Sequence, residues 1–269
     1  MTRSLKEIMA TTLRSSVAGA TPNGTTPSMS GQKKNDTNGT MASCEVCHDA
    51  GWLVDRSSAT TGFTVIECPA CHLPMRRRLA QDDERFGYTE HLRHHDLSQW
   101  EQTEDTTLAY LAARNYIELA QGWLVLWGPR GTGKTMLLSC IVNGLRAKGI
   151  EAVYAVVPDM LDMLRRSYNV DERGNEGWSF GPLMERLETV PVLVLDDLAV
   201  EKPTEWAQEK LYQIIDARYR ARVLLLVATN VAPTKLGLAG GRIASSLQDK
   251  RISVVVKCGV ADYRIKSQQ

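Results

Sequence analysis

The chain has 269 residues, enough for one α/β domain of ordinary size and a small additional module. Its 32 Lys and Arg residues are matched by 31 Asp and Glu residues, which excludes a global positive field that attracts nucleic acid. No stretch approaches the roughly 20 consecutive apolar residues of a membrane span, and the start of the chain lacks the apolar core of a secretory signal. We therefore expect a cytoplasmic protein with no membrane partner.

Residues 1–43 predict a short amphipathic helix followed by a disordered linker. Within residues 1–17 the apolar positions recur at helical spacing, and so short a helix cannot bury them by itself; they are Leu5, Ile8, Met9, Leu13 and Val17. Residues 18–43 are dominated by Thr, Gly, Pro, Ser, Asn and Lys and contain no aromatic residue, which is typical of a flexible linker.

Residues 44–78 predict a small zinc module that resembles a zinc ribbon. Cys44 and Cys47 form one CxxC pair, and Cys68 and Cys71 form a second pair after 20 intervening residues. Two such pairs supply four thiolates, which close a tetrahedral structural Zn²⁺ site and leave no position open for catalysis. Two short strands are expected on either side of residues 57–61, and residues 79–122 predict a mostly helical connector.

Haem attachment and disulfide formation are two other uses of these cysteines. His48 and His72 follow the two pairs, so each pair also matches the CxxCH pattern of covalent haem attachment. No export signal accompanies the pattern, and a cytosolic location also disfavours disulfides, so zinc is the preferred interpretation. Whether His48 or His72 replaces a cysteine as a zinc ligand stays open.

Residues 123–269 alternate short apolar runs with longer helical patterns, which predicts an α/β domain with a five-stranded parallel sheet. The expected strands are 123–127, 152–157, 192–196, 223–228 and 252–256, and the expected helices are 134–148, 158–168, 182–189 and 204–222.

The first strand leads into a P-loop pattern that is followed directly by a helix. The pattern comprises Gly128, Pro129, Arg130, Gly131, Thr132, Gly133, Lys134 and Thr135, with Met136 next in the helix. Such a loop surrounds the β-phosphate of ATP with backbone N–H groups at the positive end of the helix. Lys134 is expected to contact the β- and γ-phosphates as a catalytic residue, and Thr135 to ligate Mg²⁺.

Acidic and amide side chains follow two other expected strands. Asp196 ends a buried run and is expected to ligate Mg²⁺ directly or through water, whereas Asp197 is placed to orient or deprotonate the attacking water. Asn230 follows the fourth strand, where it can contact that water or the γ-phosphate. The alternatives are that the acids cap a helix and that Asn230 is a turn residue. Beside a P-loop, the pattern predicts ATP hydrolysis.

These motifs resemble the DnaC/DnaI-type replicative helicase loaders and the related IstB-type transposition ATPases, a branch of the AAA+ proteins. The resemblance covers about residue 81 to the C-terminus and is carried by residues 128–135, 194–198, 201–206, 210–219 and 228–230. It implies an AAA+ P-loop fold with little or no helical lid and a γ-phosphate contact from Arg264. The zinc module resembles the DnaI arrangement, which implies a hexameric replicative helicase as partner, with single-stranded DNA and self-association through ATP sites.

One position departs from the loader pattern. Ser246 stands where loaders usually carry an arginine that reaches the ATP of a neighbouring subunit. Arg242 or Arg251 can take the place of that arginine. The alternative is that both are solvated surface charges.

Two segments have the composition of a single-stranded DNA contact, which combines basic and aromatic side chains. The first is an insertion between the second and third strands that contains Arg165, Arg166, Tyr168, Trp178 and Phe180, and the second is the run 76–78 of three arginines. The simpler alternatives are aromatic residues that pack inward and solvated arginines.

The leading hypothesis is an ATP-dependent loader of the replicative helicase onto single-stranded DNA. The alternatives are an IstB-like transposition helper ATPase and a zinc-containing adaptor that binds ATP with little turnover.

Overall fold

The computed structural model describes residues 44–46, 52–55, 64–100, 102–103, 105–171, 179–198 and 204–259, all within the unit that spans Ser43–Gln269. The expected helix of residues 1–17 and linker of residues 18–43 lie outside the described residues, as do Cys47, His48, Trp178 and Arg264. Within the described part, no helix is long and apolar enough to cross a membrane.

A hairpin and a series of helices precede the main sheet. Strands β1 (Trp52–Asp55) and β2 (Thr64–Glu67) pair antiparallel, so the two short strands predicted within the cysteine module are confirmed. The helices that follow are α2 (Leu73–Phe86), α3 (Glu90–Arg93), the 3-10 turn η1 (Leu97–Gln99) and α4 (Thr107–Leu119). The expected module boundary after residue 78 falls inside α2.

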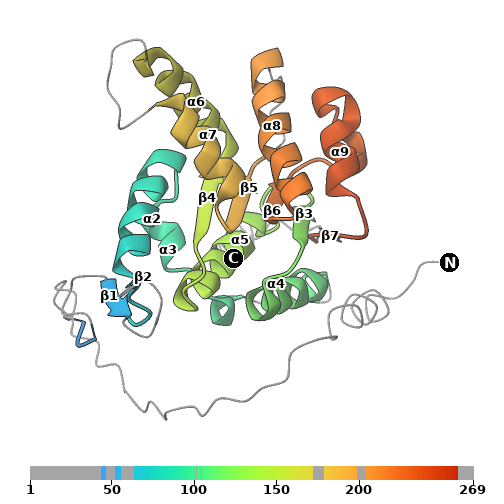
Figure 1. Cartoon of the computed structure of the whole chain (residues 1–269). Coiled ribbons are helices and arrows are strands. Elements are labelled where there is room, and N and C mark those ends of the chain that lie inside the picture. Colours follow the sequence, from blue (N-terminus) through green and yellow to red (C-terminus); the bar gives the residue numbers. More distant parts are fainter. Residues whose placement is uncertain are drawn as a thin grey trace. The chain divides into compact units, whose positions relative to one another are not determined.

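The main sheet has five strands, all parallel, in the spatial order β4-β5-β6-β3-β7 (Figure 1). Its strands are β3 (Trp123–Trp127), β4 (Ala152–Val156), β5 (Val192–Asp196), β6 (Leu224–Thr229) and β7 (Ser253–Lys257). The helices between them are α5 (Lys134–Ala147), α6 (Val157–Asp171), α7 (Phe180–Thr189), α8 (Glu205–Ala221) and α9 (Arg242–Leu247), with 3-10 turns η3 (Pro233–Lys235) and η4 (Leu238–Gly241). The predicted five-stranded parallel sheet is confirmed.

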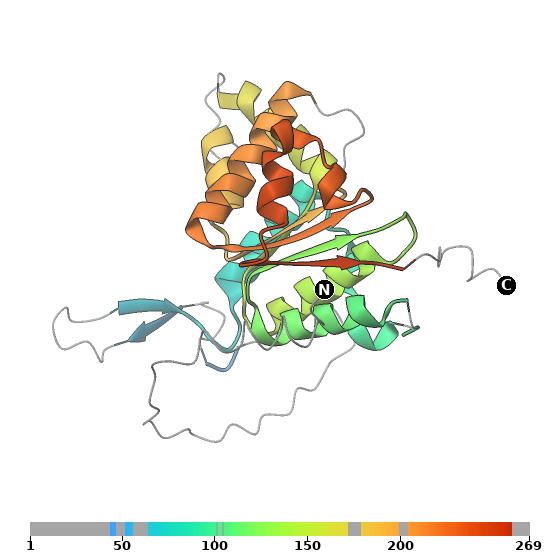
Figure 2. The ribbon, with the colours of Figure 1, turned by 90° about the vertical axis from the view of Figure 1, so that its right-hand side faces the viewer.

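Helices cover both faces of the sheet, as Figure 2 shows in a view that looks nearly along it. Neighbouring strand residues point to opposite faces, so Leu124 and Leu126 pack against α4 and α5, whereas Trp123 and Val125 pack toward α6, α7, α8 and α9. Because both faces are buried, the strands read as continuous apolar runs in the sequence. This explains why the strand bounds agree with the predicted ones to within one residue.

One helix of the sheet domain was not predicted. Helix α9 (Arg242–Leu247) has six residues and begins directly after Gly241, whose φ of 83° lies in the left-handed region. So short a helix shows less than two full turns of the apolar period, and the preceding glycines are typical of a loop. The sequence pattern therefore does not indicate this helix.

Candidate functional site

The loop between β3 and α5 has the backbone conformation that its glycines predict. Gly128, Gly131 and Gly133 have φ values of 154°, 79° and 81°, which side-chain-bearing residues rarely adopt. A Cβ atom on Gly133 would also lie 2.4 Å from the ring of Trp100, so this position has no room for a side chain. The loop therefore requires glycine for backbone and packing reasons together.

A pocket of about 750 Å³ opens beside this loop. Nine of the predicted site residues line it: Arg130, Gly131, Gly133, Lys134, Thr135, Met136, Asp196, Asp197 and Asn230. The remaining three predicted loop residues, Gly128, Pro129 and Thr132, take part in hydrogen bonds within the loop. The Lys134 Nζ donates to the carbonyl oxygens of Gly128 at 2.8 Å and Pro129 at 2.7 Å, and Thr132 Oγ1 donates to the Pro129 carbonyl at 3.0 Å.

The predicted acids meet their partners at the carboxyl end of the sheet. Thr135 Oγ1 donates to Asp196 Oδ2 at 2.9 Å, and the Asn230 amide donates to Asp197 Oδ1 at 2.9 Å. Asp197 itself has a φ of 56°, in the left-handed region. Two pairs, one with Thr135 of the P-loop helix and one with Asn230 directly after β6, thus line one pocket.

Asp196 is 7% exposed, and burial raises the pKa of its carboxyl. Hydrogen bonds from Tyr154, Thr135 and the backbone N–H of Asp197 act in the opposite direction, since they stabilise the carboxylate. Burial and the adjacent Asp196 raise the pKa of Tyr154 strongly, which keeps its hydroxyl a hydrogen-bond donor. A buried carboxylate beside the Thr135 hydroxyl is a donor set that suits a hard cation such as Mg²⁺.

The sequence did not identify the residues that the connector adds to the pocket. His91, Leu92 and His95 line it, and the rings of the two histidines lie 4.8 Å apart. His95 Nδ1 is 2.6 Å from Ser139 Oγ in α5, and burial lowers the pKa of this histidine, with smaller effects from the neighbouring histidines. The sequence feature that could have indicated them is the spacing of His91 and His95, one helical turn apart on a segment that otherwise reads as a polar connector.

Three of the four predicted zinc ligands lie together. The Sγ atoms of Cys44, Cys68 and Cys71 are within 4.8 Å of one another, and those of Cys44 and Cys68 are 3.8 Å apart. This spacing fits three corners of a tetrahedral thiolate site, with Cys47 outside the described residues. His72 does not belong to this cluster; its ring lies where a Cβ atom on Gly149 would meet Nε2 at 2.6 Å.

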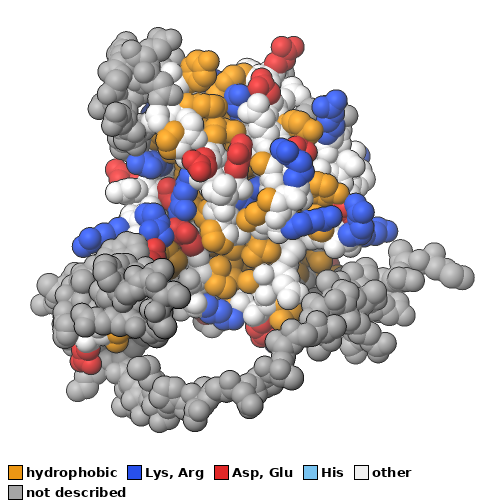
Figure 3. Space-filling model, in the orientation of Figure 1, with side chains coloured by type: hydrophobic (Ala, Val, Ile, Leu, Met, Phe, Trp, Pro, Cys, Tyr) orange, Lys and Arg blue, Asp and Glu red, His pale blue; other side chains and the backbone are white. Residues whose placement is uncertain are grey.

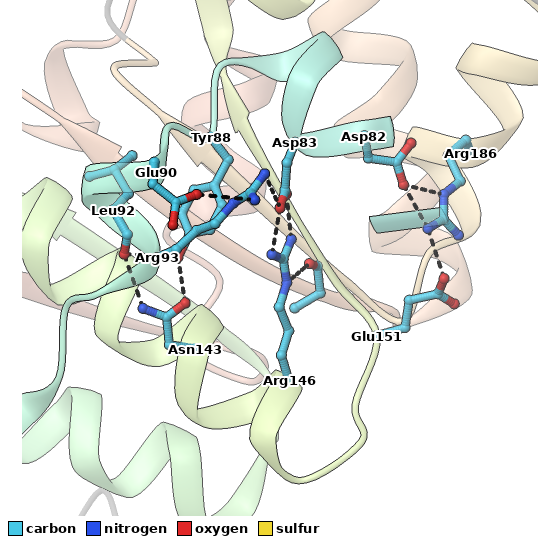
Figure 4. A network of polar contacts seen from close by, with 11 residues as sticks. Asp82, Asp83, Tyr88, Glu90, Leu92, Arg93, Asn143, Arg146, Glu151 and Arg186 are labelled. Atoms are coloured by element: carbon cyan, nitrogen blue, oxygen red, sulfur yellow. Dashed lines mark hydrogen bonds and ion pairs between the residues drawn. The ribbon is translucent and has the colours of Figure 1, made fainter. Parts of the chain in front are cut away.

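Helix α2 is fixed to the sheet domain by two acidic residues that are almost fully buried (Figure 4). Asp82 accepts a hydrogen bond from Arg186 in α7 at 2.8 Å, and Arg186 also contacts Glu151 at 2.8 Å. Asp83 accepts two bonds from Arg146 in α5, at 2.7 and 2.9 Å. The segment that follows the cysteines is therefore an integral part of the domain surface, beside the edge strand β4.

The model of the family described as IstB-like ATP binding protein matches residues 75–266. The chain belongs to this family. The match includes the P-loop, Asp196, Asp197 and most of α2, so the pocket described above lies within the part of the chain that matches the ATP-binding family.

Curated relatives of this IstB-like chain include both proteins of insertion sequences and helicase loaders. The ATP-binding protein of insertion sequence IS1162 from Pseudomonas fluorescens is 31% identical over 51% of this chain and 55% of its own length. The replicative helicase loader DnaI of Bacillus subtilis is 28% identical over 46% of this chain and 38% of its own length. The chain thus spans about half the length, or less, of the curated relatives it matches.

Solved structures with the same fold include a DnaC helicase loader, which is 19% identical, has a TM-score of 0.54 and covers 63% of this chain and 99% of its own. The replication initiator DnaA bound to AMPPCP and single-stranded DNA is 20% identical, has a TM-score of 0.53 and covers 62% of this chain and 50% of its own. At these identities the likeness concerns the fold alone, and the expected AAA+ fold is confirmed. The IstB-like chain is a member of the AAA+ ATPases.

Proposed function

We propose that this IstB-like protein hydrolyses Mg²⁺-bound ATP and uses the cycle to load a replicative helicase onto single-stranded DNA. The observation that carries the ATPase part is the convergence of the Thr135–Asp196 and Asn230–Asp197 pairs on the P-loop pocket. A phosphate cradle, a metal site and an oriented water are the parts that phosphoryl transfer requires.

Each residue of the site has a role in this proposal. Thr135 and Asp196 hold Mg²⁺, which neutralises charge on the phosphates, and Lys134 turns from the loop carbonyls to the phosphate oxygens when ATP is bound. Asp197 orients the attacking water, and the Asn230 amide holds the Asp197 carboxylate in place. Arg264 contributes a γ-phosphate contact in the proposal, although it lies outside the described residues.

A surface at the ends of α6, α7 and α8 supports binding of single-stranded DNA. Tyr168 is 58% exposed, and its ring lies 5.5 Å from that of Phe180 in an edge-to-face arrangement. The Arg165 guanidinium lies 5.1 Å from the Trp206 ring centre, and Lys210 Nζ lies 5.4 Å from that of Phe180. In Figure 3, hydrophobic side chains gather over this part of the molecule, with basic and acidic side chains among them. An exposed aromatic ring among cations offers a base a stacking partner beside charges for the phosphates.

In the second expected DNA contact, the run 76–78, one of the three arginines already has acidic partners within the protein. Arg78 is paired with Glu67 at 2.9 Å and with Glu151 at 3.2 Å, so its charge is already compensated within the protein. Replacement of Tyr168 by alanine is therefore the sharper test, and it should weaken binding of single-stranded DNA by about 1–3 kcal/mol, the contribution of one stacked base. Arg77→Ala serves as the control and should change binding less.

The proposed partner is a hexameric replicative helicase in the cytoplasm, contacted through the N-terminal region with its zinc module. Both helicase loaders and an insertion-sequence protein are among the relatives, so a transposition helper is the second candidate. The cysteine module favours the loader, because it resembles the DnaI arrangement. The third candidate is a zinc-containing adaptor that binds ATP with little turnover.

Affinity capture with the purified protein separates these candidates. A loader should retain the replicative helicase in the presence of ATP and raise the amount of helicase bound to a single-stranded circle. Retention of a transposase in place of the helicase would favour the transposition helper. An adaptor would retain a partner without ATP turnover, whether or not single-stranded DNA is present.

Self-association through the ATP sites would place a cation of one subunit beside the ATP of another, and we propose Arg251 for this role in place of an arginine at Ser246. Ser246 and Arg251 line the same pocket of about 680 Å³, which does not include Arg242. Asp249 and Tyr219 hold the Arg251 side chain in one direction, at 2.7 and 3.1 Å, whereas the Arg242 guanidinium lies over the Tyr212 ring.

This assignment predicts that Arg251→Ala slows hydrolysis under conditions of self-association without weakening nucleotide binding, and that Arg242→Ala does neither. Ser246→Arg should restore turnover to the Arg251→Ala variant. A trans-acting arginine can contribute about 10³-fold or more to the rate. Unchanged turnover in Arg251→Ala would remove this residue from the mechanism.

A further inference from the structure

Asp196 carries a hydrogen bond that neither the P-loop nor the acidic motif supplies. Its Oδ2 atom accepts from Thr135 Oγ1 at 2.9 Å and also from the Tyr154 hydroxyl at 2.5 Å. Its Oδ1 atom accepts from the backbone N–H of Asp197 at 3.0 Å. Both carboxylate oxygens are therefore engaged, and the longest side chain among the donors comes from a different strand, β4.

The position of Tyr154 in the sheet explains how its hydroxyl reaches this atom. In the parallel pair of β4 and β5, Tyr154 lies opposite Val194, and Asp196 is two residues further along β5 on the same face. A diagonal neighbour of this kind is roughly 7–8 Å away between Cα atoms, within reach of an aromatic side chain and beyond that of a short one. A hydroxyl at the end of a tyrosine ring spans this gap.

Tyr154 is also held so that its hydroxyl has little freedom. The residue is fully buried, and its ring lies 4.7 Å from that of Tyr88. Tyr88 is itself fixed, because its hydroxyl lies 2.7 Å from Asn143 Oδ1 and the Arg146 guanidinium lies 4.9 Å from its ring centre. A donor in such surroundings defines the orientation of the carboxylate it contacts.

We infer that Tyr154 is a positioning residue that orients Asp196 for Mg²⁺ at the nucleotide site. The inference rests on the proposed Mg²⁺ site at Thr135 and Asp196. Groups that hydrogen-bond a metal-ligating carboxylate fix its direction, and their loss typically lowers metal affinity or activity by about 10- to 100-fold. Tyr154 would act in this way through Asp196, without touching the nucleotide or the metal.

The test compares Tyr154→Phe with Tyr116→Phe, two variants that each lose one tyrosine hydroxyl and keep a buried ring. Binding of a fluorescent ADP is measured by titration with and without Mg²⁺. Mg²⁺ should raise the affinity for ADP, and the Mg²⁺ concentration at half of this gain is the quantity compared. In Tyr154→Phe this concentration should rise about 10-fold or more, while the affinity for ADP in EDTA stays at the wild-type value. Tyr116→Phe should leave both values unchanged, since its hydroxyl donates to the Gly122 carbonyl at 3.0 Å and not to Asp196.

An equal Mg²⁺ response in Tyr154→Phe and wild type, or an equal shift in both variants, would overturn the inference. Wild-type protein whose ADP affinity does not respond to Mg²⁺ would instead refute the proposed metal site. If Tyr154→Phe does not fold, wild-type protein labelled with ¹³C at the tyrosine Cζ gives the same answer. A tyrosine signal should move when Mg²⁺ is added to ADP-saturated protein, and a spectrum without such a change would reject the role of Tyr154.

Discussion

The nucleotide-binding domain and the cysteine module use different physical means to hold their functional side chains. In the domain, five parallel strands and two buried apolar clusters fix the P-loop, Asp196 and Asn230 relative to one another. In the module, the described structure consists of two strands of four residues and three neighbouring thiols. Burial thus creates the pocket before any ligand binds, whereas we propose that the thiol site and the fold around it depend on a bound metal.

The two regions meet at α2. Glu67, next to Cys68, contacts Arg78 of α2, and Arg78 contacts Glu151 at the start of β4, which in turn contacts Arg186. Polar contacts therefore run from β2 through α2 into the domain, and Met75 and Leu79 of α2 belong to the apolar cluster of the domain. We expect the domain to remain folded when the two strands of the module do not.

Lys134→Ala should abolish ATP hydrolysis while the domain keeps its fold. The lysine supplies the charge that meets the phosphates, and its ammonium group donates to two carbonyls of the loop. Turnover and thermal unfolding are measured on the same preparation. Lys148→Ala is a matched control, because Lys148 also donates to a backbone carbonyl, that of Ile117, at a distance from the pocket. Wild-type turnover in Lys134→Ala would refute the site.

Removal of the metal should unfold the module alone. We expect about one zinc per chain in the purified protein, and its loss in Cys68→Ser, because three thiolates cannot hold the ion as four do. Hydrogen exchange should then become fast in β1 and β2 while the midpoint of domain unfolding stays unchanged. Cys140→Ala removes a buried thiol outside the cluster and should retain the zinc. Protein without metal when prepared without chelator, or unfolding of both regions together, would contradict this separation.

The same contrast explains what the sequence could predict. The P-loop, Asp196, Asp197 and Asn230 could be predicted as neighbours because strand ends and glycine spacing are local patterns with fixed consequences for a parallel sheet. The contributions of His91, His95 and Tyr154 were missed, since they depend on where the connector packs and on a diagonal contact between two strands. The zinc ligands were proposed from spacing alone, and the structure brings three of them together.

Arg186→Ala should destabilise the domain by about 2–3 kcal/mol, because it leaves the buried Asp82 carboxylate without its partner. Burial already raises the pKa of Asp82, so the unpaired carboxyl should bind a proton more readily still. Urea unfolding measures the loss, and Arg114→Ala, which removes an exposed pair with Glu118, should cost less than about 0.5 kcal/mol. Equal effects in both variants would mean that the contact with α2 adds little stability.

His72→Asn should have the smallest effect, and it decides whether His72 is a zinc ligand. His72 precedes α2 with a φ of 49°, and asparagine tolerates this left-handed conformation better than alanine, so the substitution tests the imidazole and not the backbone. The ring packs against Gly149 and lies outside the thiol cluster. We therefore expect wild-type zinc content and a stability loss of about 1 kcal/mol or less, from lost packing alone. Loss of zinc in His72→Asn would make His72 a ligand and would tie the module to the α5–β4 turn through the metal itself.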